Sequence, residues 1–156
     1  MRPYKDDVVK VFESSSYLVK EMDNDGIDLR FTVSGVCELN CKSTTRLIQL
    51  LADQRYEGQT DIDHNLNQIF DKYKASLDKP KSFFNKHKPL SLYILTDGVW
   101  EADCNPDATI RSLVKKLVDL GYTRQQVGIQ FISFGDDPTG LSRLNHLDSG
   151  LDLDLY

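Results

Sequence analysis

The stretch Leu90–Trp100, LSLYILTDGVW, constrains the fold of this 156-residue chain more than any other part of it. It opens with a mostly apolar run and breaks at Thr96-Asp97-Gly98. A short apolar run with branched and aromatic side chains is typical of a strand buried on both faces. The break places a carboxylate and a glycine at the carboxyl end of that strand, where open α/β sheets bind ligands. An ordinary Asp-Gly turn, with Asp97 capping the next segment, fits the same residues equally well.

The rest of the chain alternates between helical and strand-like spacing of its apolar residues. This alternation predicts an α/β fold with a mostly parallel sheet covered by helices, although doubly wound folds usually begin with a strand and this chain begins with a helix. One predicted helix follows Asn105 and carries Leu120 in its buried stripe, with Gly121 as its stop. The other predicted helices cover Lys5–Met22, a segment from Ser43 or Thr44, a segment from Thr60 or Asp61 to about Leu77, and a short segment ending near Leu147. The other predicted strands are Ile27–Val33, Val127–Phe134 and a short edge strand around Val36–Leu39.

Composition limits the domain count and the partners. The length suits one domain spanning residues 1–156, and 40% hydrophobic with 28% charged residues is ordinary for a soluble globular chain. A net charge of −5 argues against a nucleic-acid partner. No apolar run approaches a membrane span or a signal-peptide core, so we expect no membrane partner. Three cysteines, an odd number, are read as reduced thiols of a cytoplasmic protein.

Recognisable catalytic motifs are missing from the sequence. It holds no Walker glycine loop, no G-x-G-x-x-G and no G-x-S-x-G nucleophile elbow. Cys104 lies near Asp97 and has the chemistry of a nucleophile, but no residue is marked as its base. The three histidines stand in no recognisable relation to a nucleophile. We therefore expect that this chain is not an enzyme. The alternative is an α/β enzyme that uses Asp97 as a base or as a metal ligand.

Four segments, taken in order, carry a resemblance to a known family. They read MDNDGIDLRF, GQTDIDHNLNQIFDKY, LYILTDGVWEA and GIQFISFGDDPTGLSRLNHLDSGL. Together with the first helix they cover nearly the whole chain, and a Gly-x-Thr loop upstream of a strand that ends in TDG is moderately specific. The chain resembles a von Willebrand factor A domain, in particular the uncharacterised intracellular versions found in fungi.

The resemblance implies a three-layer Rossmann-like fold with helices on both faces of the sheet and a non-enzymatic role in protein interaction. The family binds a divalent cation, usually Mg²⁺, in a metal-ion-dependent adhesion site, and an acidic residue of a protein partner completes the metal shell. The site uses Asp-x-Ser-x-Ser, a threonine that matches Thr60, and the TDG aspartate that matches Asp97. The ligand contacts implied around them are Gln59, Asp61, Gly98, Val99, Trp100 and Glu101.

The sequence departs from the family pattern because it contains no Asp-x-Ser-x-Ser. The chain begins just past the place of that motif, so the first, central strand is expected to be missing and the domain to be partial. Thr60 and Asp97 fill only two of about six magnesium positions, which predicts weak or absent metal binding. Ile27–Val33 and Leu90–Leu95 are then expected to pair directly or to expose unpaired edges. A degenerate fragment without a ligand is a further alternative.

Overall fold

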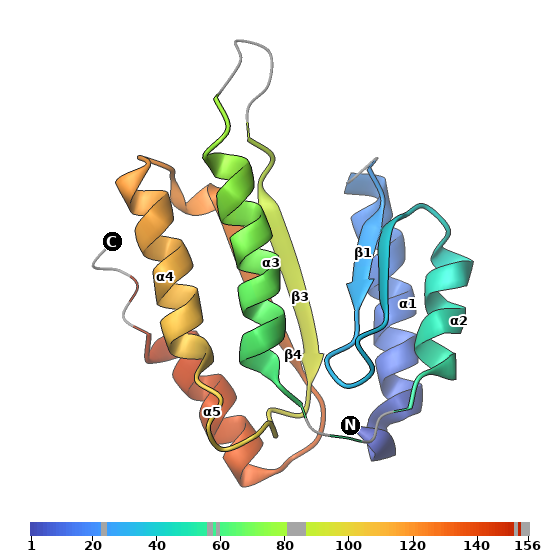
Figure 1. Cartoon of the computed structure of the whole chain (residues 1–156). Helices are drawn as coiled ribbons and strands as arrows, with labels where there is room; N and C mark the ends of the chain where they lie inside the picture. The colour runs from blue at the N-terminus through green and yellow to red at the C-terminus, as the bar shows by residue number, and fades with distance from the viewer. Residues whose placement is uncertain (23–24, 56–57, 59, 81–86, 152, 154–156) are drawn as a thin grey trace. The chain divides into compact units, whose positions relative to one another are not determined.

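The protein is a mixed α/β chain whose contacts divide it into two compact units, Met1–Thr60 and Asp61–Tyr156 (Figure 1). The structure is a computed structural model, and it describes residues 1–22, 25–55, 58, 60–80, 87–151 and 153. The α/β class predicted from the alternating pattern is confirmed. The single domain over residues 1–156 stays a prediction.

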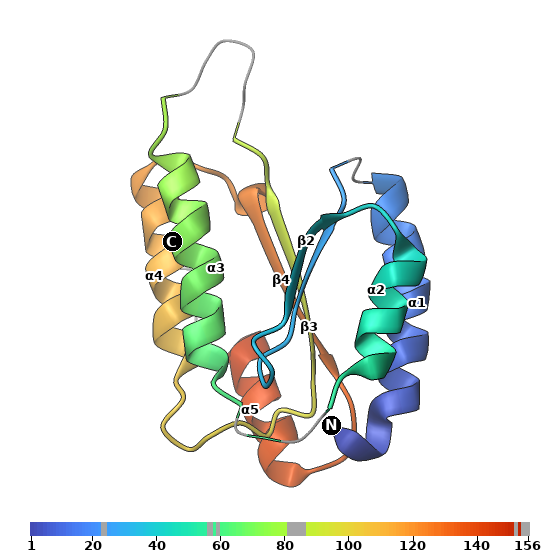
Figure 2. The same ribbon diagram turned by 45° about the vertical axis from the view of Figure 1, so that its right-hand side comes forward.

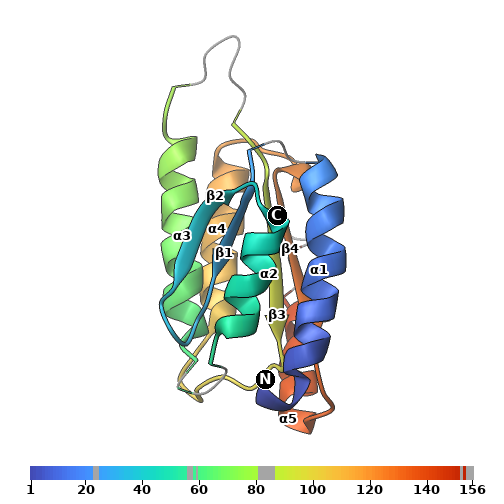
Figure 3. The same cartoon turned by 90° about the vertical axis from the view of Figure 1, so that its right-hand side faces the viewer.

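The first unit packs two helices against a β-hairpin (Figure 3). Its buried side chains include Val8 and Phe12 from the first helix and Leu47 and Leu51 from the second. Gly26 adopts a φ of +99°, and a Cβ there would lie 2.7 Å from the Asn40 carbonyl, so the entry to the hairpin requires glycine. The elements are η1 (Arg2–Tyr4), α1 (Lys5–Met22), β1 (Ile27–Arg30), β2 (Cys37–Cys41) and α2 (Thr44–Asp53), with β1 and β2 antiparallel.

Three sequence predictions can be compared with the structure in this unit. The strand predicted over Ile27–Val33 is shorter, because the chain turns at residues 32–34 and returns as β2. The edge strand expected around Val36–Leu39 is present as β2. The start of α2 is as predicted, since the Ser43 side chain accepts a hydrogen bond from the Arg46 N–H.

The second unit holds a parallel strand pair with helices packed against it. β3 and β4 pair in register from Leu90 opposite Val127 to Thr96 opposite Ser133. Because the strands are parallel, their carboxyl ends meet at one edge, and α4 crosses between them. The elements are α3 (Ile62–Leu77), β3 (Leu90–Thr96), α4 (Pro106–Asp119), η2 (Arg124–Gln126), β4 (Val127–Ser133) and α5 (Pro138–Ser149).

One face of this strand pair forms the core of the second unit. Figure 2 shows α3 and α4 side by side along β3 and β4. On the opposite face, Ser91 and Gln130 are exposed, Tyr93 keeps 44% of its surface accessible, and Leu95 and Ile132 are half-buried. Phe70 of α3 and Leu113 of α4 are fully buried. Other members of this apolar cluster are Leu66, Leu90, Leu92, Ile94, Trp100, Ile110, Leu117, Val127, Ile129, Phe131, Leu144 and Leu147.

The end of α4 corrects one sequence prediction. Leu120 was expected in the buried stripe, but it is the C-cap residue and is 39% exposed. The helix ends one residue before it, so the periodicity no longer directs its side chain to the core. Gly121, with a φ of +71°, ends the helix as predicted. Among the described residues, no helix has the length and apolar character needed to cross a membrane.

The amino-terminal edge of the β3–β4 pair is closed by hydrogen bonds around Tyr73 of α3. Its hydroxyl donates to the Lys88 carbonyl at 3.0 Å and accepts from the Gln126 side chain at 2.7 Å. Burial is the main cause that raises the pKa of the Tyr73 phenol above its ordinary value. These bonds tie α3 to the starts of both strands, which leaves the carboxyl edge as the more open end for a site.

Truncating Phe70 to alanine is expected to destabilise the second unit strongly. Phe70 is fully buried in the apolar cluster, so the variant loses its transfer free energy and leaves a cavity. We expect the free energy of unfolding to fall by about 3–5 kcal/mol for Phe70→Ala, measured by urea denaturation. Leu141→Ala is the control, because Leu141 is 40% exposed and should cost less than about 1 kcal/mol. Equal losses in the two variants would contradict this core.

Candidate functional site

The loop after β3 is held in a tight turn by its own side chains. The buried Thr96 hydroxyl accepts a hydrogen bond from the Gly98 N–H at 3.0 Å. The Asp97 carboxylate accepts from the Val99 N–H at 3.2 Å, and Asp97 is half-buried. The capping role that the sequence allowed for Asp97 is therefore present. A carboxylate offers about four lone-pair sites, so one such bond is compatible with a ligand role as well.

Two glycines bring this loop against the first turn of α5. Gly98 has a φ of +74°, and a Cβ there would lie 2.5 Å from the Gly140 carbonyl oxygen. A Cβ on Gly140 would lie 2.1 Å from the Asp97 carbonyl oxygen. The start of α5 is fixed in turn by Asp137, whose carboxylate accepts from the N–H groups of Thr139 and Gly140 at 2.9 and 3.0 Å. Backbone contact therefore sets the position of the loop.

The residues predicted for the metal site belong to different parts of the chain. Thr60 ends the first unit, whereas Asp97 and Gly98 lie in the second. Asp61, rather than Thr60, is the N-cap of α3, and its side chain accepts from the His64 N–H at 2.8 Å. The predicted contact Gln59 lies outside the described residues. A site joining Thr60 to Asp97 stays a prediction.

Metal ligands do not cluster in the part of the chain that the structure describes: it contains no group of three or more His, Cys, Asp or Glu side chains arranged for a metal ion. Magnesium also accepts hydroxyl groups and water, so a magnesium site does not require such a cluster. Magnesium binding through Thr60 and Asp97 therefore stays a prediction too.

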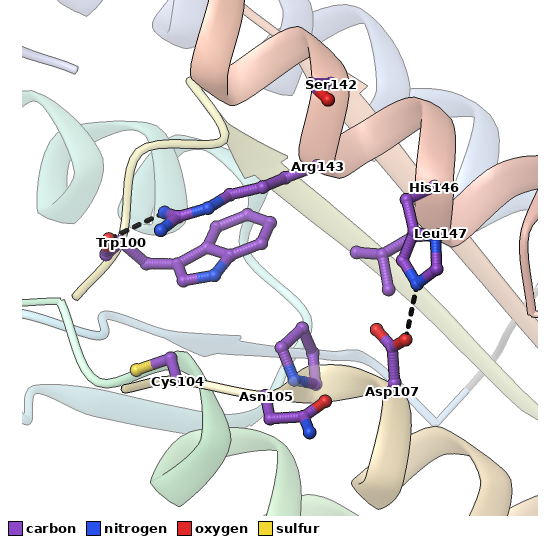
Figure 4. Close-up of a pocket in the computed structure, with 9 residues that line it drawn as sticks. Trp100, Cys104, Asn105, Asp107, Ser142, Arg143, His146 and Leu147 are labelled. Atoms are coloured by element: carbon purple, nitrogen blue, oxygen red, sulfur yellow. Dashed lines mark hydrogen bonds and ion pairs between the residues drawn. The ribbon is translucent and has the colours of Figure 1, made fainter. Parts of the chain in front are cut away.

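A pocket of about 360 Å³ opens beside Trp100, between the start of α4 and α5 (Figure 4). Its volume is at the lower end of the range for small-molecule sites. The start of α4 is positioned by Asp63 of α3, whose carboxylate accepts a hydrogen bond from the Asn105 N–H. The pocket is lined by Trp100, Cys104, Asn105, Pro106, Asp107, Ser142, Arg143, His146 and Leu147.

Trp100 and Arg143 form one wall of this pocket. Trp100 was predicted as a ligand contact, and it is 7% exposed, so its ring belongs to both the core and the pocket wall. The guanidinium carbon of Arg143 lies 5.3 Å from the centroid of that ring. One guanidinium nitrogen, Nη1, donates to the Trp100 carbonyl at 2.7 Å (Figure 4). The cation–π contact and the hydrogen bond together hold the Arg143 guanidinium in place. The other predicted contact in this loop, Glu101, is exposed.

His146 and Asp107 form a second polar pair at the pocket. His146 Nε2 lies 2.5 Å from Asp107 Oδ2, which links α5 to the first turn of α4. The sequence analysis did not find this pair, because 39 residues separate the partners and no motif connects them. Figure 4 places Cys104 across the pocket from the pair. A general base must lie within hydrogen-bond reach of its nucleophile. The geometry therefore gives no support to His146 as a base for Cys104.

Replacing Gly98 by alanine is expected to be far more costly than replacing other glycines. The added Cβ meets Gly140 backbone and sits at a positive φ, so we expect Gly98→Ala to lose about 2 kcal/mol or more of unfolding free energy. Gly121→Ala has the positive φ but open space, and should lose about 1 kcal/mol. Gly128→Ala has neither problem and should be close to neutral. Chemical denaturation measures all three; an equal loss for Gly98→Ala and Gly121→Ala would contradict the backbone contact.

Comparisons with protein-family models, with curated proteins and with solved structures gave no match. The resemblance to the von Willebrand factor A family therefore stays a prediction. The two features of the structure that bear on function are the carboxyl edge of β3 and the pocket beside it.

Proposed function

We propose that this chain is a non-enzymatic protein-interaction domain of the von Willebrand factor A type. The proposal includes the three-layer Rossmann-like fold, with a mostly parallel sheet, helices on both faces and the first central strand missing. It also includes an incomplete metal-ion-dependent adhesion site with Thr60 and Asp97 as its remaining ligands. The partner is a protein, and an acidic residue of that protein is its natural contact with such a site.

The observation that carries the proposal is the parallel β3–β4 pair with Thr96-Asp97-Gly98 at its carboxyl end. Ligands of open α/β sheets bind outside this edge. The loop is rigid there, because Gly98 packs on Gly140, and it exposes Val99, of which 47% is accessible. A fixed loop that presents an exposed apolar side chain suits recognition of a protein surface.

Strand pairing is consistent with a partial sheet. Among the described residues, β1 pairs only with β2 and β3 only with β4. β3 carries no charged residue and no proline, the usual devices that protect an open strand edge. An edge without charged residues or proline is the feature expected of a strand whose neighbour is missing.

A single glutamate on the loop after β3 is expected to abolish partner capture. In Val99→Glu, a negative charge replaces an exposed apolar side chain on the proposed contact face and repels the acidic residue of the partner. Val118→Glu is the matched control, because Val118 is 41% exposed near the C-terminal end of α4, where the same glutamate should cost no more than about 1 kcal/mol of stability. Capture by the immobilised chain should show proteins retained by the native chain and by Val118→Glu but lost with Val99→Glu.

The outcome of this capture experiment separates the proposal from its alternatives. Capture that is unchanged by Val99→Glu would overturn the proposed contact face. No specific capture by the native chain would favour a fragment without a ligand. Repeating the capture with a chelator shows whether any metal contributes to it.

Magnesium is expected to bind weakly or not at all. Thr60 and Asp97 supply only two of about six ligand positions, so the ion keeps most of its water. Calorimetric titration with Mg²⁺ should give no saturable heat, and the melting temperature should not rise with metal concentration. A saturable isotherm that disappears in Asp97→Asn would instead show that other residues complete the site.

A further inference from the structure

The pocket beside Trp100 contains a guanidinium, that of Arg143, which no acidic side chain contacts among the described residues. Its ionisable groups include Asp107, Arg143 and His146. Asp107 is already engaged by His146 at 2.5 Å. Arg143 contacts the Trp100 ring and carbonyl, and among the described residues it has no carboxylate partner. The guanidinium is therefore the charge in the pocket to which an incoming anion would bind.

The donors of Arg143 are only partly used. A guanidinium has five N–H donors in a planar fork, and the contact with the Trp100 carbonyl uses Nη1. The contact with the Trp100 ring, 5.3 Å from the guanidinium carbon to the ring centroid, is a cation–π contact that uses none of these donors. Such a fork matches a carboxylate with two parallel bonds. Because Trp100 already holds the group in place, little side-chain freedom is lost on binding.

The start of α4 favours the same kind of ligand. Its N-cap Asn105 makes no side-chain capping bond, and Pro106 occupies the first turn. The first amides of a helix carry partial positive charge and lack acceptors within the helix. The apolar walls formed by Trp100, Pro106 and Leu147 suit the carbon part of a ligand. The start of α4 alone would not define a site. Here it lies in the same cavity as the Arg143 guanidinium, which has no carboxylate partner among the described residues.

We propose that this pocket binds a carboxylate group, with Arg143 as its principal contact. A single guanidinium matches a carboxylate monoanion better than a phosphate dianion, because the Asp107 carboxylate in the same pocket repels the dianion more strongly. The carboxylate comes either from a small organic acid or from an acidic side chain of a protein. The proposal stands on the pocket geometry and does not depend on the family assignment or on a metal.

The chain offers a direct probe, because Trp100 is its only tryptophan. Its intrinsic fluorescence therefore comes from a single residue, whose ring lines the pocket. We would titrate the full chain with succinate, with a glutamate-containing peptide, with inorganic phosphate and with the uncharged analogue succinamide, at constant ionic strength. A saturable change with succinate or the peptide, and none with succinamide, is the expected result. The stronger of the two carboxylate probes identifies the source.

Three variants test the role of each charge, with calorimetry as a second readout because Arg143→Gln also alters the surroundings of Trp100. Arg143→Gln should weaken carboxylate binding by at least about 10-fold, as expected for a lost charged hydrogen bond. Lys115→Gln removes the same charge from an exposed position on α4 outside the pocket and should bind as the native chain does. Asp107→Asn removes the opposing carboxylate and should tighten binding several-fold, a gain that a damaged fold cannot produce.

Several results would overturn the carboxylate pocket. They are the absence of saturable binding by any carboxylate probe, equal affinity in Arg143→Gln and the native chain, and binding of phosphate in preference to carboxylates. None of them affects the contact face tested by Val99→Glu, so this proposal and the proposed function fail independently.

Discussion

The contact between the Gly98 and Gly140 backbones is the constraint on which the candidate site depends. It joins the loop after β3 to the first turn of α5 at a distance that no side chain could occupy. The parallel ladder of β3 and β4 has already brought both carboxyl ends to one edge. Together these two contacts fix where Asp97, Trp100 and the residues of α5 lie relative to one another. The candidate site at the carboxyl edge of β3 therefore requires both contacts.

The pocket follows from that constraint. Because the loop after β3 and the first turn of α5 are in backbone contact, Trp100 packs into the core and its ring contacts the guanidinium of Arg143. The opposite side of the pocket is closed by His146 and Asp107, which connect α5 to the start of α4. The pocket then holds a carboxylate bonded to His146 and a guanidinium that contacts the Trp100 ring and carbonyl. The thiol of Cys104 lies across the pocket from His146 (Figure 4).

The parallel β3–β4 pair of the second unit packs one face into the apolar core, whereas several side chains of its other face are exposed. Parallel sheets are normally covered on both faces, since the crossover helices lie above and below them. Here Tyr93 stays accessible, and β3 has no charged residue to protect its edge. The unprotected edge of β3 agrees with the missing strand that we propose.

Local signals determined most of the elements. The apolar periodicity predicted α1, α3, α4, β3 and β4 because each of these buries one face of a regular repeat. Ser43 and Asp61 mark helix starts because a short side-chain oxygen can accept the first amides. The same local rules failed at Val33 and Leu120, which lie beyond the ends of their elements. Boundaries of this kind depend on where the neighbouring chain turns.

The carboxyl edge of β3 was also predictable from sequence, since a buried strand followed by Thr-Asp-Gly places polar groups at its end. Only the tertiary structure decided what surrounds that edge. The stacking of Arg143 on Trp100 and the pairing of His146 with Asp107 join residues about 40 positions apart along the chain. No spacing rule connects such residues, because their approach results from the strand ladder and the glycine contact rather than from any local periodicity.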